Sequence, residues 1–181
     1  MPLYGDIVLA LCIAHTYWIG SLHFTPYLWL TSPTKQCGKT AVLELCELLS
    51  RRPWRLSNPS AAALFRIIEL ERLTFLLDEY DTLNGNRLDE MTGVLNDGFS
   101  IRCKVARCVG DDHEVRSFCV FCAKAIAAIG TTVADAAWSR CIRLPMARVT
   151  GLRLAERPGS GPAQAAARPG RPESLAKIDS G

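Results

Sequence analysis

The sequence lacks the features that mark secreted, repetitive and membrane-spanning proteins. It has no basic segment followed by an apolar run and a small-residue cleavage site, the pattern of a secretory signal, and it shows no internal repeat. Its most apolar stretch, residues 7–30, is interrupted by polar residues and a proline: His15, Ser21, His23, Thr25 and Pro26. We therefore expect a packed helix and a buried strand there, no membrane span, and a cytoplasmic protein.

The chain also has little net charge, and its charges are unevenly placed. Residues 1–145 contain 15 Lys and Arg against 15 Asp and Glu, whereas residues 146–181 contain 6 against 3. The first segment therefore gives little reason to expect nucleic-acid binding from charge alone. Residues 157–172 are rich in Pro, Gly, Ala and Arg and have no apolar period, so we predict a disordered tail over 146–181.

Eight cysteines would suit a disulfide-rich secreted protein, but a chain of 181 residues with 49% hydrophobic residues can build a packed core without bridges. We expect reduced thiols in a reducing compartment. An alternative is a four-thiolate zinc site formed by Cys103, Cys108, Cys119 and Cys122. The spacing of Cys119 and Cys122 is also that of redox motifs. Residues three apart in a strand point to opposite faces, which argues against joint ligation by Cys119 and Cys122.

The stretch that carries chemistry runs from Ser32 to Thr40 and ends in Gly-Lys-Thr. An apolar run, 27–30, precedes it and a helical pattern, 41–50, follows it, which is the strand–loop–helix context of a phosphate-binding loop. Backbone N–H groups and the helix dipole would meet phosphate oxygens there. We expect a nucleotide to be bound by Thr34, Lys35, Gln36, Cys37, Gly38, Lys39 and Thr40.

Within that loop, Lys39 would reach the β- and γ-phosphates, and the Thr40 hydroxyl would take a magnesium position. Gly38 would let the backbone approach the phosphates closely. One residue departs from the full pattern: Pro33 stands where a glycine is expected five residues before Gly38. Proline has no N–H to offer, and Gly-Lys-Thr alone is common by chance.

A second segment supplies what such a loop needs. The apolar run 73–77 is followed directly by Asp78 and Glu79, 38 residues after Thr40. Asp78 would hold the magnesium through water, and Glu79 would polarise the attacking water. A solvated strand end is the alternative interpretation. The two segments in this order predict ATP and Mg²⁺ as cofactors.

Hydrophobic periods divide the rest of the chain into alternating helices and strands. Helical patterns cover 6–19, 39–50, 59–70, 87–97 and 134–139, and strand patterns cover 27–30, 54–56, 73–77, 125–129 and 140–144. Residues 100–121 read as a β-hairpin. The alternation predicts an α/β fold over 1–145: a three-layer P-loop NTPase with a central, mainly parallel sheet and a β-hairpin insertion.

These segments resemble a family of P-loop ATPases, domain-of-unknown-function family 3631, found in phage, plasmid and integrated-element replication proteins. The resemblance covers about residues 5–145 in order, and rests on the loop and on further runs: 60–66, 77–81, 95–98, 107–110, 124–130 and 140–142. The family tolerates the Ser-Pro start of the loop. The resemblance implies an α/β nucleotide-binding fold, and the family's neighbours imply helicase-like work on DNA.

Two departures from the family pattern stand out. The family has an acidic residue before the arginine that matches Arg140, whereas this chain has Ser139. The family also continues with charged, helical sequence where this chain has its Pro/Gly/Ala/Arg-rich segment. A truncated chain and an end translated in a shifted frame are both consistent with that difference.

Two further residues are candidates for catalysis. Arg140 could act as an arginine finger or sensor for charge on the γ-phosphate, or could form a salt bridge or face solvent at a strand edge. Thr131, at the end of the run 125–129, could contact the γ-phosphate or water, or could cap the next helix. Basic residues of the hairpin, Arg102, Lys104, Arg107 and Arg116, could contact a phosphate backbone or simply be solvated.

Together these patterns predict a magnesium-dependent ATPase of a mobile-element replication system, with catalytic residues Glu79, Arg140 and Thr131. The expected partners are a nucleotide, DNA through a larger replication protein, and further copies of the chain. A degenerate, non-hydrolysing nucleotide-binding remnant or oligomerisation module is the second interpretation. A small-molecule kinase is the third, although an acid pair suits water activation better.

Overall fold

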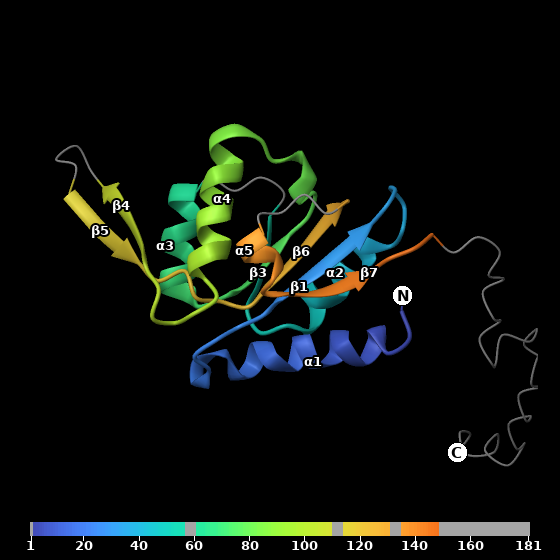
Figure 1. Ribbon diagram of the computed structural model, residues 1–181. Coiled ribbons are helices and arrows are strands. Elements are labelled where there is room, and N and C mark those ends of the chain that lie inside the picture. The colour runs from blue at the N-terminus through green and yellow to red at the C-terminus, as the bar shows by residue number, and fades with distance from the viewer. Residues whose placement is uncertain (1, 57–60, 110–113, 131–134, 149–181) are drawn as a thin grey trace, which may run out of the picture. The chain divides into compact units, whose positions relative to one another are not determined.

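The computed structural model describes residues 2–56, 61–109, 114–130 and 135–148. The chain divides into two compact units, 1–148 and 149–181, and the second unit lies outside the described residues (Figure 1). The predicted tail over 146–181 therefore stays a prediction, except at its start. Met146 is buried, and its N–H donates to the carbonyl of Thr31 over 2.7 Å, so it belongs to the first unit.

The first unit is built on a five-stranded sheet in the order β2-β3-β6-β1-β7. Its strands are β1 (Tyr27–Ser32), β2 (Pro53–Leu56), β3 (Thr74–Leu77), β6 (Lys124–Ile129) and β7 (Cys141–Pro145). Every pairing in this sheet is parallel. The prediction of an α/β fold with a central parallel sheet is confirmed.

Helices cover both faces of the sheet. Successive strand residues point to opposite faces, so strands that are apolar throughout have two apolar faces to bury. In β1, Leu28 and Leu30 pack with Leu43 of α2 (Lys39–Leu49) and Leu9 of α1 (Gly5–Trp18). Tyr27 and Trp29 of the same strand pack on the other face. That face is covered by α3 (Ala61–Glu71), α4 (Gly85–Asp97) and α5 (Asp135–Trp138). Figure 1 shows α1 on one side of the sheet and α3 and α4 on the other.

The hairpin consists of β4 (Val105–Val109) and β5 (Glu114–Phe118), which pair antiparallel as a separate two-stranded sheet. It extends away from the main sheet beside α3 (Figure 1). Its base is anchored on that helix, since the rings of Phe65 and Phe118 stack with centroids 6.2 Å apart. The guanidinium of Arg107 lies 4.7 Å from the centre of the Phe65 ring. The predicted hairpin insertion is confirmed.

The hairpin is shorter than the sequence pattern suggested. Alternation of Ile101, Cys103 and Val105 predicted a strand, but residues 100–103 form a turn closed by the Cys103 N–H on the Ser100 carbonyl. The Ile101 N–H instead donates to the carbonyl of His23, 3.0 Å away. Ile101 packs with Ile19 and Phe121, so this segment joins the α1–β1 connection rather than β4.

Two single-turn helices complete the unit: η1 (Ile19–Ser21) after α1, and η2 (Tyr80–Thr82) after β3. Among the described residues, no helix is both long and apolar enough to cross a membrane.

Candidate nucleotide-binding site

The loop predicted to bind phosphate lies between β1 and α2, at the carboxyl end of the central strand β1. Gly38 is the N-cap of α2 with φ 81°, a left-handed conformation that glycine adopts without strain. No side chain caps this helix. The first N–H groups of a helix have no partner within it, so this end of α2 presents unpaired donors to an anion.

Side-chain hydrogen bonds within the loop hold its conformation. The Ser32 hydroxyl donates to the Thr34 carbonyl over 2.6 Å, and the Lys39 ammonium donates to the Ser32 hydroxyl oxygen. Lys39 therefore lies across the loop, close to the N-terminus of α2. Cys37 is buried, with its sulfur 3.5 Å from the Thr34 hydroxyl. That hydrogen bond, with help from the nearby Lys39 charge, lowers the pKa of the Cys37 thiol.

The strand order brings the acid pair to the loop. Parallel strands end at one edge of a sheet, and β3 is separated from β1 only by β6. Asp78, directly after β3, accepts a hydrogen bond from the Thr40 hydroxyl with 3.3 Å between Oγ1 and Oδ2. The two predicted magnesium residues are therefore neighbours. A hydroxyl and a carboxylate are hard oxygen donors, which suits Mg²⁺.

Glu79 follows Asp78 directly and lies in a tight turn. Its backbone is left-handed, with φ 57°, and its carbonyl accepts from both the N–H and the hydroxyl of Thr82, at 2.9 and 2.8 Å. The Glu79 N–H donates to Oδ1 of Asp78 over 3.0 Å. The Glu79 side chain is exposed at the same sheet edge as the loop. This position is compatible with the predicted work on water, which stays a prediction.

The end of β6 is tied to both halves of the site. The Thr31 hydroxyl donates to the Gly130 carbonyl over 2.6 Å, and the Gly130 N–H donates to the Ser32 carbonyl over 3.0 Å. On the other side, the Ile129 N–H donates to Asp81 of η2 over 2.8 Å. Thr131, the next predicted catalytic residue, lies outside the described residues.

Arg140 is not brought to the loop. It precedes β7, and its carbonyl accepts from the N–H of Tyr27, the first residue of β1. It therefore lies at the amino edge of the sheet, about 16 Å of strand away from the loop. Its guanidinium donates to the carbonyls of Leu95 and Asn96 at the end of α4 and lies 5.3 Å from the Phe99 ring centre. The structure therefore does not bring Arg140 to this chain's own nucleotide-binding loop, and its role as an arginine finger or sensor stays a prediction.

Sequence reasoning missed Arg55, which lies on β2 next to β3. Its Nη2 lies 3.0 Å from Oδ2 of Asp78, and its Nη1 lies 3.5 Å from Glu47 and 3.8 Å from Glu44 of α2. The side chains of Arg55 and Asp78 are 22% and 14% exposed, so solvent screens this pair only in part. The available signal was an arginine within the strand pattern 54–56, but nothing in the sequence placed that strand beside the acid-bearing one.

The cysteines do not gather into a metal site in the part of the chain that the structure describes. Cys103 and Cys108 are exposed, whereas Cys122 is buried. Burial raises the pKa of the Cys122 thiol above its usual value. The zinc interpretation therefore gains no support from the geometry.

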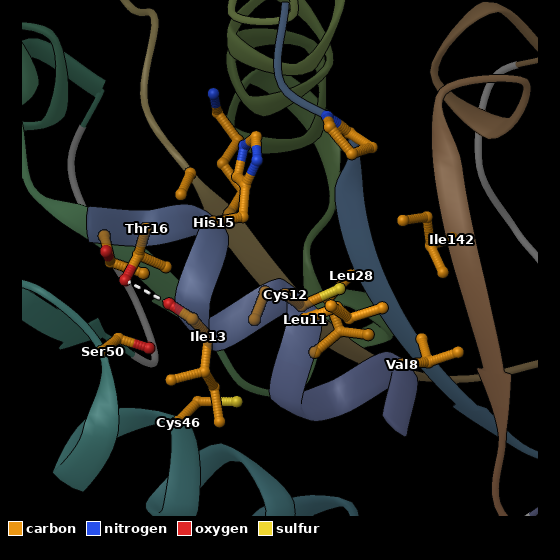
Figure 2. A pocket seen from close by; sticks show the side chains of 15 residues that line it. Val8, Leu11, Cys12, Ile13, His15, Thr16, Leu28, Cys46, Ser50 and Ile142 are labelled. Atoms are coloured by element: carbon orange, nitrogen blue, oxygen red, sulfur yellow. Dashed lines mark hydrogen bonds between the residues drawn. The ribbon is translucent and has the colours of Figure 1, made fainter. Parts of the chain in front are cut away.

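A separate cavity of about 270 Å³ lies between α1 and the sheet. Figure 2 shows its wall, which is mostly apolar and includes Val8, Leu11, Cys12, Leu28 and Ile142. The Thr16 hydroxyl donates to the Ile13 carbonyl over 2.7 Å, drawn dashed in Figure 2. Further lining residues include Pro26, just before β1, and Thr74 and Lys124, the first residues of β3 and β6, so the cavity lies at the amino edge of the sheet. It is distinct from the loop site.

No family model matches the sequence, and no curated protein matches it. Among solved structures, the RuvB Holliday junction branch migration motor of Thermotoga maritima is similar to this chain at 16% identity and a TM-score of 0.48, over 78% of this chain and 43% of that one. JCV helicase bound to a small molecule is similar at 17% identity and a TM-score of 0.48, over 81% and 41%. A second JCV helicase structure is similar at 16% identity and a TM-score of 0.45, over 81% and 40%. The chain thus spans about two fifths of the length of these solved chains.

Proposed function

We propose that this chain binds ATP with magnesium at the loop between β1 and α2 and hydrolyses it. The observation that supports the proposal most strongly is the 3.3 Å contact between Thr40 and Asp78. It joins a residue of the Gly-Lys-Thr loop to a strand-end carboxylate from a segment 38 residues away. This contact lies outside the hydrophobic core, since Thr40 is exposed and Asp78 follows the buried strand β3.

Each residue has a defined task in this proposal. The N–H groups at the start of α2 bind phosphate oxygens, and Lys39 moves from Ser32 onto the β- and γ-phosphates. Thr40 and Asp78 hold the magnesium, which neutralises charge that builds on the transferred phosphoryl group. Glu79 orients the attacking water and accepts its proton as a general base.

The finer part of the proposal is that this ATPase works in the replication of a mobile element, in a helicase-like protein. It rests only on the resemblance of residues 5–145 to domain-of-unknown-function family 3631, which no matching family model supports. DNA would then be engaged through a larger replication protein, and the active form would be a homo-oligomer in the cytoplasm. ATP turnover measured with and without single-stranded DNA tests this part, because a DNA-coupled motor hydrolyses faster with DNA present.

Nucleotide binding should depend on Lys39. Titrating a fluorescent ATP analogue with Mg²⁺ present should give an affinity at least about tenfold weaker for Lys39→Ala, because the variant lacks the cation that meets the phosphates. Arg66→Ala is the matched control: it removes one exposed positive charge from α3, on the other face of the sheet. Equal titration curves for Lys39→Ala and the parent would remove the site assignment.

A second candidate function is nucleotide binding without hydrolysis. One observation favours it: Arg55 already pairs with Asp78. Single-turnover assays with excess protein separate the two candidates. Bound ATP that is released intact supports the binding module, and conversion to ADP supports the ATPase.

A further inference from the structure

Asp78 has a positively charged partner at the carboxylate oxygen that also faces Thr40. Arg55 Nη2 lies 3.0 Å from Asp78 Oδ2, and the Thr40 hydroxyl lies 3.3 Å from the same atom. A guanidinium and a divalent cation repel each other, and both are attracted by this carboxylate. Arg55 and a metal ion at Thr40 and Asp78 therefore compete for one oxygen.

Arg55 also has two other carboxylates within reach. Glu44 and Glu47 lie four and seven residues beyond Thr40, so all three face the same side of α2. Their oxygens lie 3.8 and 3.5 Å from Nη1 of Arg55. The Glu44 and Glu47 side chains are more exposed than that of Asp78, so they hold the guanidinium more weakly in the arrangement shown.

We propose that Arg55 is a metal-dependent latch, which leaves Asp78 for Glu44 and Glu47 when a divalent cation binds with the nucleotide. This rests on the proposed nucleotide site. In the latched arrangement the Arg55 guanidinium neutralises the Asp78 carboxylate. The contacts of Asp78 with Arg55 and Thr40 then join the ends of β2 and β3 to the start of α2. In the released arrangement Asp78 is free for the cation, and the two glutamates compensate the charge of Arg55. Arg55 is thus a positioning residue that acts through Asp78.

The latch makes paired predictions for metal affinity. Mn²⁺ is the probe, because it shares the oxygen-rich octahedral preference of Mg²⁺ and its free form is measured by electron paramagnetic resonance. With ADP present, Arg55→Met should tighten Mn²⁺ binding about fivefold, the scale of one partly exposed ion pair. The Glu44→Gln/Glu47→Gln variant should weaken it about as much, because Arg55 then keeps Asp78 as its sole carboxylate among these three.

Long-range electrostatics alone would also tighten Mn²⁺ binding in Arg55→Met and weaken it in Glu44→Gln/Glu47→Gln. A third variant therefore distinguishes the latch from that simpler effect. Combining Arg55→Met with Glu44→Gln and Glu47→Gln should give the affinity of Arg55→Met alone to within about twofold, because the glutamates act only through Arg55. If the glutamate substitutions weaken Mn²⁺ binding equally with and without Arg55, the latch is overturned. The control Asp6→Asn/Glu71→Gln removes two exposed carboxylates of α1 and α3 and should leave the affinity unchanged.

The same titrations separate this inference from the proposed function. A parent chain that binds neither ADP nor Mn²⁺ overturns both. A parent chain that binds them, with Arg55→Met unchanged in affinity, overturns the latch and leaves the nucleotide site in place. Thermal unfolding without metal completes the test. The Glu44→Gln/Glu47→Gln variant should remain folded at the temperature of the titration, so that partial unfolding does not account for its weaker Mn²⁺ binding.

Discussion

Asp78 and Glu79 are adjacent in sequence but have different surroundings. Asp78 is enclosed by Thr40, Arg55 and the Glu79 N–H, whereas the Glu79 side chain is exposed on a left-handed residue. That difference suits two roles, one in metal binding and one in work on water. The left-handed backbone of Glu79 is fixed by Thr82, so a glutamine at this position should keep the same turn.

Glu79→Gln should therefore keep ATP binding and slow hydrolysis about 100-fold or more, the scale of a general-base contribution. The measurement pairs nucleotide titration with single-turnover hydrolysis. Glu71→Gln, an exposed carboxylate at the end of α3, is the control and should leave both unchanged. A Glu79→Gln protein that hydrolyses ATP at the parent rate would mean that another group orients the water.

At the same scale, strand direction explains which site residues could be predicted from sequence. Asp78 follows a parallel strand, as the loop residues follow β1, so both lie at the carboxyl edge. Arg140 precedes a strand, which places it at the amino edge. The run Arg140-Cys141-Ile142 matches a motif of the resembled family, but that match does not show at which edge of the sheet Arg140 lies. Arg55 could not be predicted, because its role depends on the pairing of β2 with β3, which brings it within reach of Asp78.

At the scale of elements, the end of α4 has a glycine that is not needed for its backbone conformation. Glycine often ends a helix in a left-handed conformation, and Gly98 is the C-cap of α4, but its φ is −78°, which any residue adopts. Glycine is required at this position because there is no space for a side chain. A Cβ atom at this position would contact the Lys124 ammonium and lie 2.6 Å from the carbonyls of Val120 and Val94.

Lys124 makes this contact costly to relieve. It is buried at the first position of β6 and donates to the carbonyls of Gly98, Val120 and Cys122 at 3.1 to 3.3 Å. Burial lowers the pKa of this lysine. A buried ammonium that loses its carbonyl partners is strongly destabilising, so it cannot move aside freely.

Gly93 within α4 and Gly98 at its C-cap therefore give opposite predictions for the same substitution. Gly98→Ala should lower the free energy of unfolding by about 1–3 kcal/mol through steric overlap and the displaced lysine. Gly93→Ala is the matched control, since its Cβ would meet only Arg107 at an ordinary 3.6 Å. It should be neutral or stabilising by up to about 1 kcal/mol, because alanine favours helix. Urea unfolding of both variants measures the difference, and equal effects would contradict the crowding at Gly98.

At the scale of the whole molecule, the periodic apolar pattern was enough to predict the layers. Strands buried on both faces read as continuous apolar runs, and helices between them have one apolar face, which together indicate a parallel sheet covered twice. Strand order was beyond that reasoning, because it depends on which crossover packs on which face. The turn at 100–103 was missed for a related reason, since its partner is the distant His23 carbonyl.

The layers also predict where the folded unit ends. Within the part of the chain that the structure describes, the last core contacts in chain order are those of Leu144 and Met146, which pack with Leu30, Leu43 and Cys37 on the α2 face of the sheet. Met146 also bonds to Thr31, the residue before the end of β1, so it closes the sheet beside the loop. A chain cut before Met146 should lose both the buried methionine and this hydrogen bond, at a cost of about 2–5 kcal/mol for the side chain.

A chain cut after Arg148 should instead keep the fold and the nucleotide site. Residues 149–181 have prolines at 158, 162, 169 and 172 and arginines scattered among Ala and Gly, so their sequence offers no apolar face whose burial could offset an ordering entropy of roughly 1–2 kcal/mol per residue. The melting temperature of the 1–148 chain should stay within a few degrees of the full chain, and its ATP affinity should match. Limited proteolysis of the full chain should yield a resistant fragment near residues 1–150. The segment has three leucines, Leu152, Leu154 and Leu175, whose packing would contradict this. If they contribute to the core, the 1–148 chain will unfold at a clearly lower temperature, and the full chain will resist the protease along its whole length.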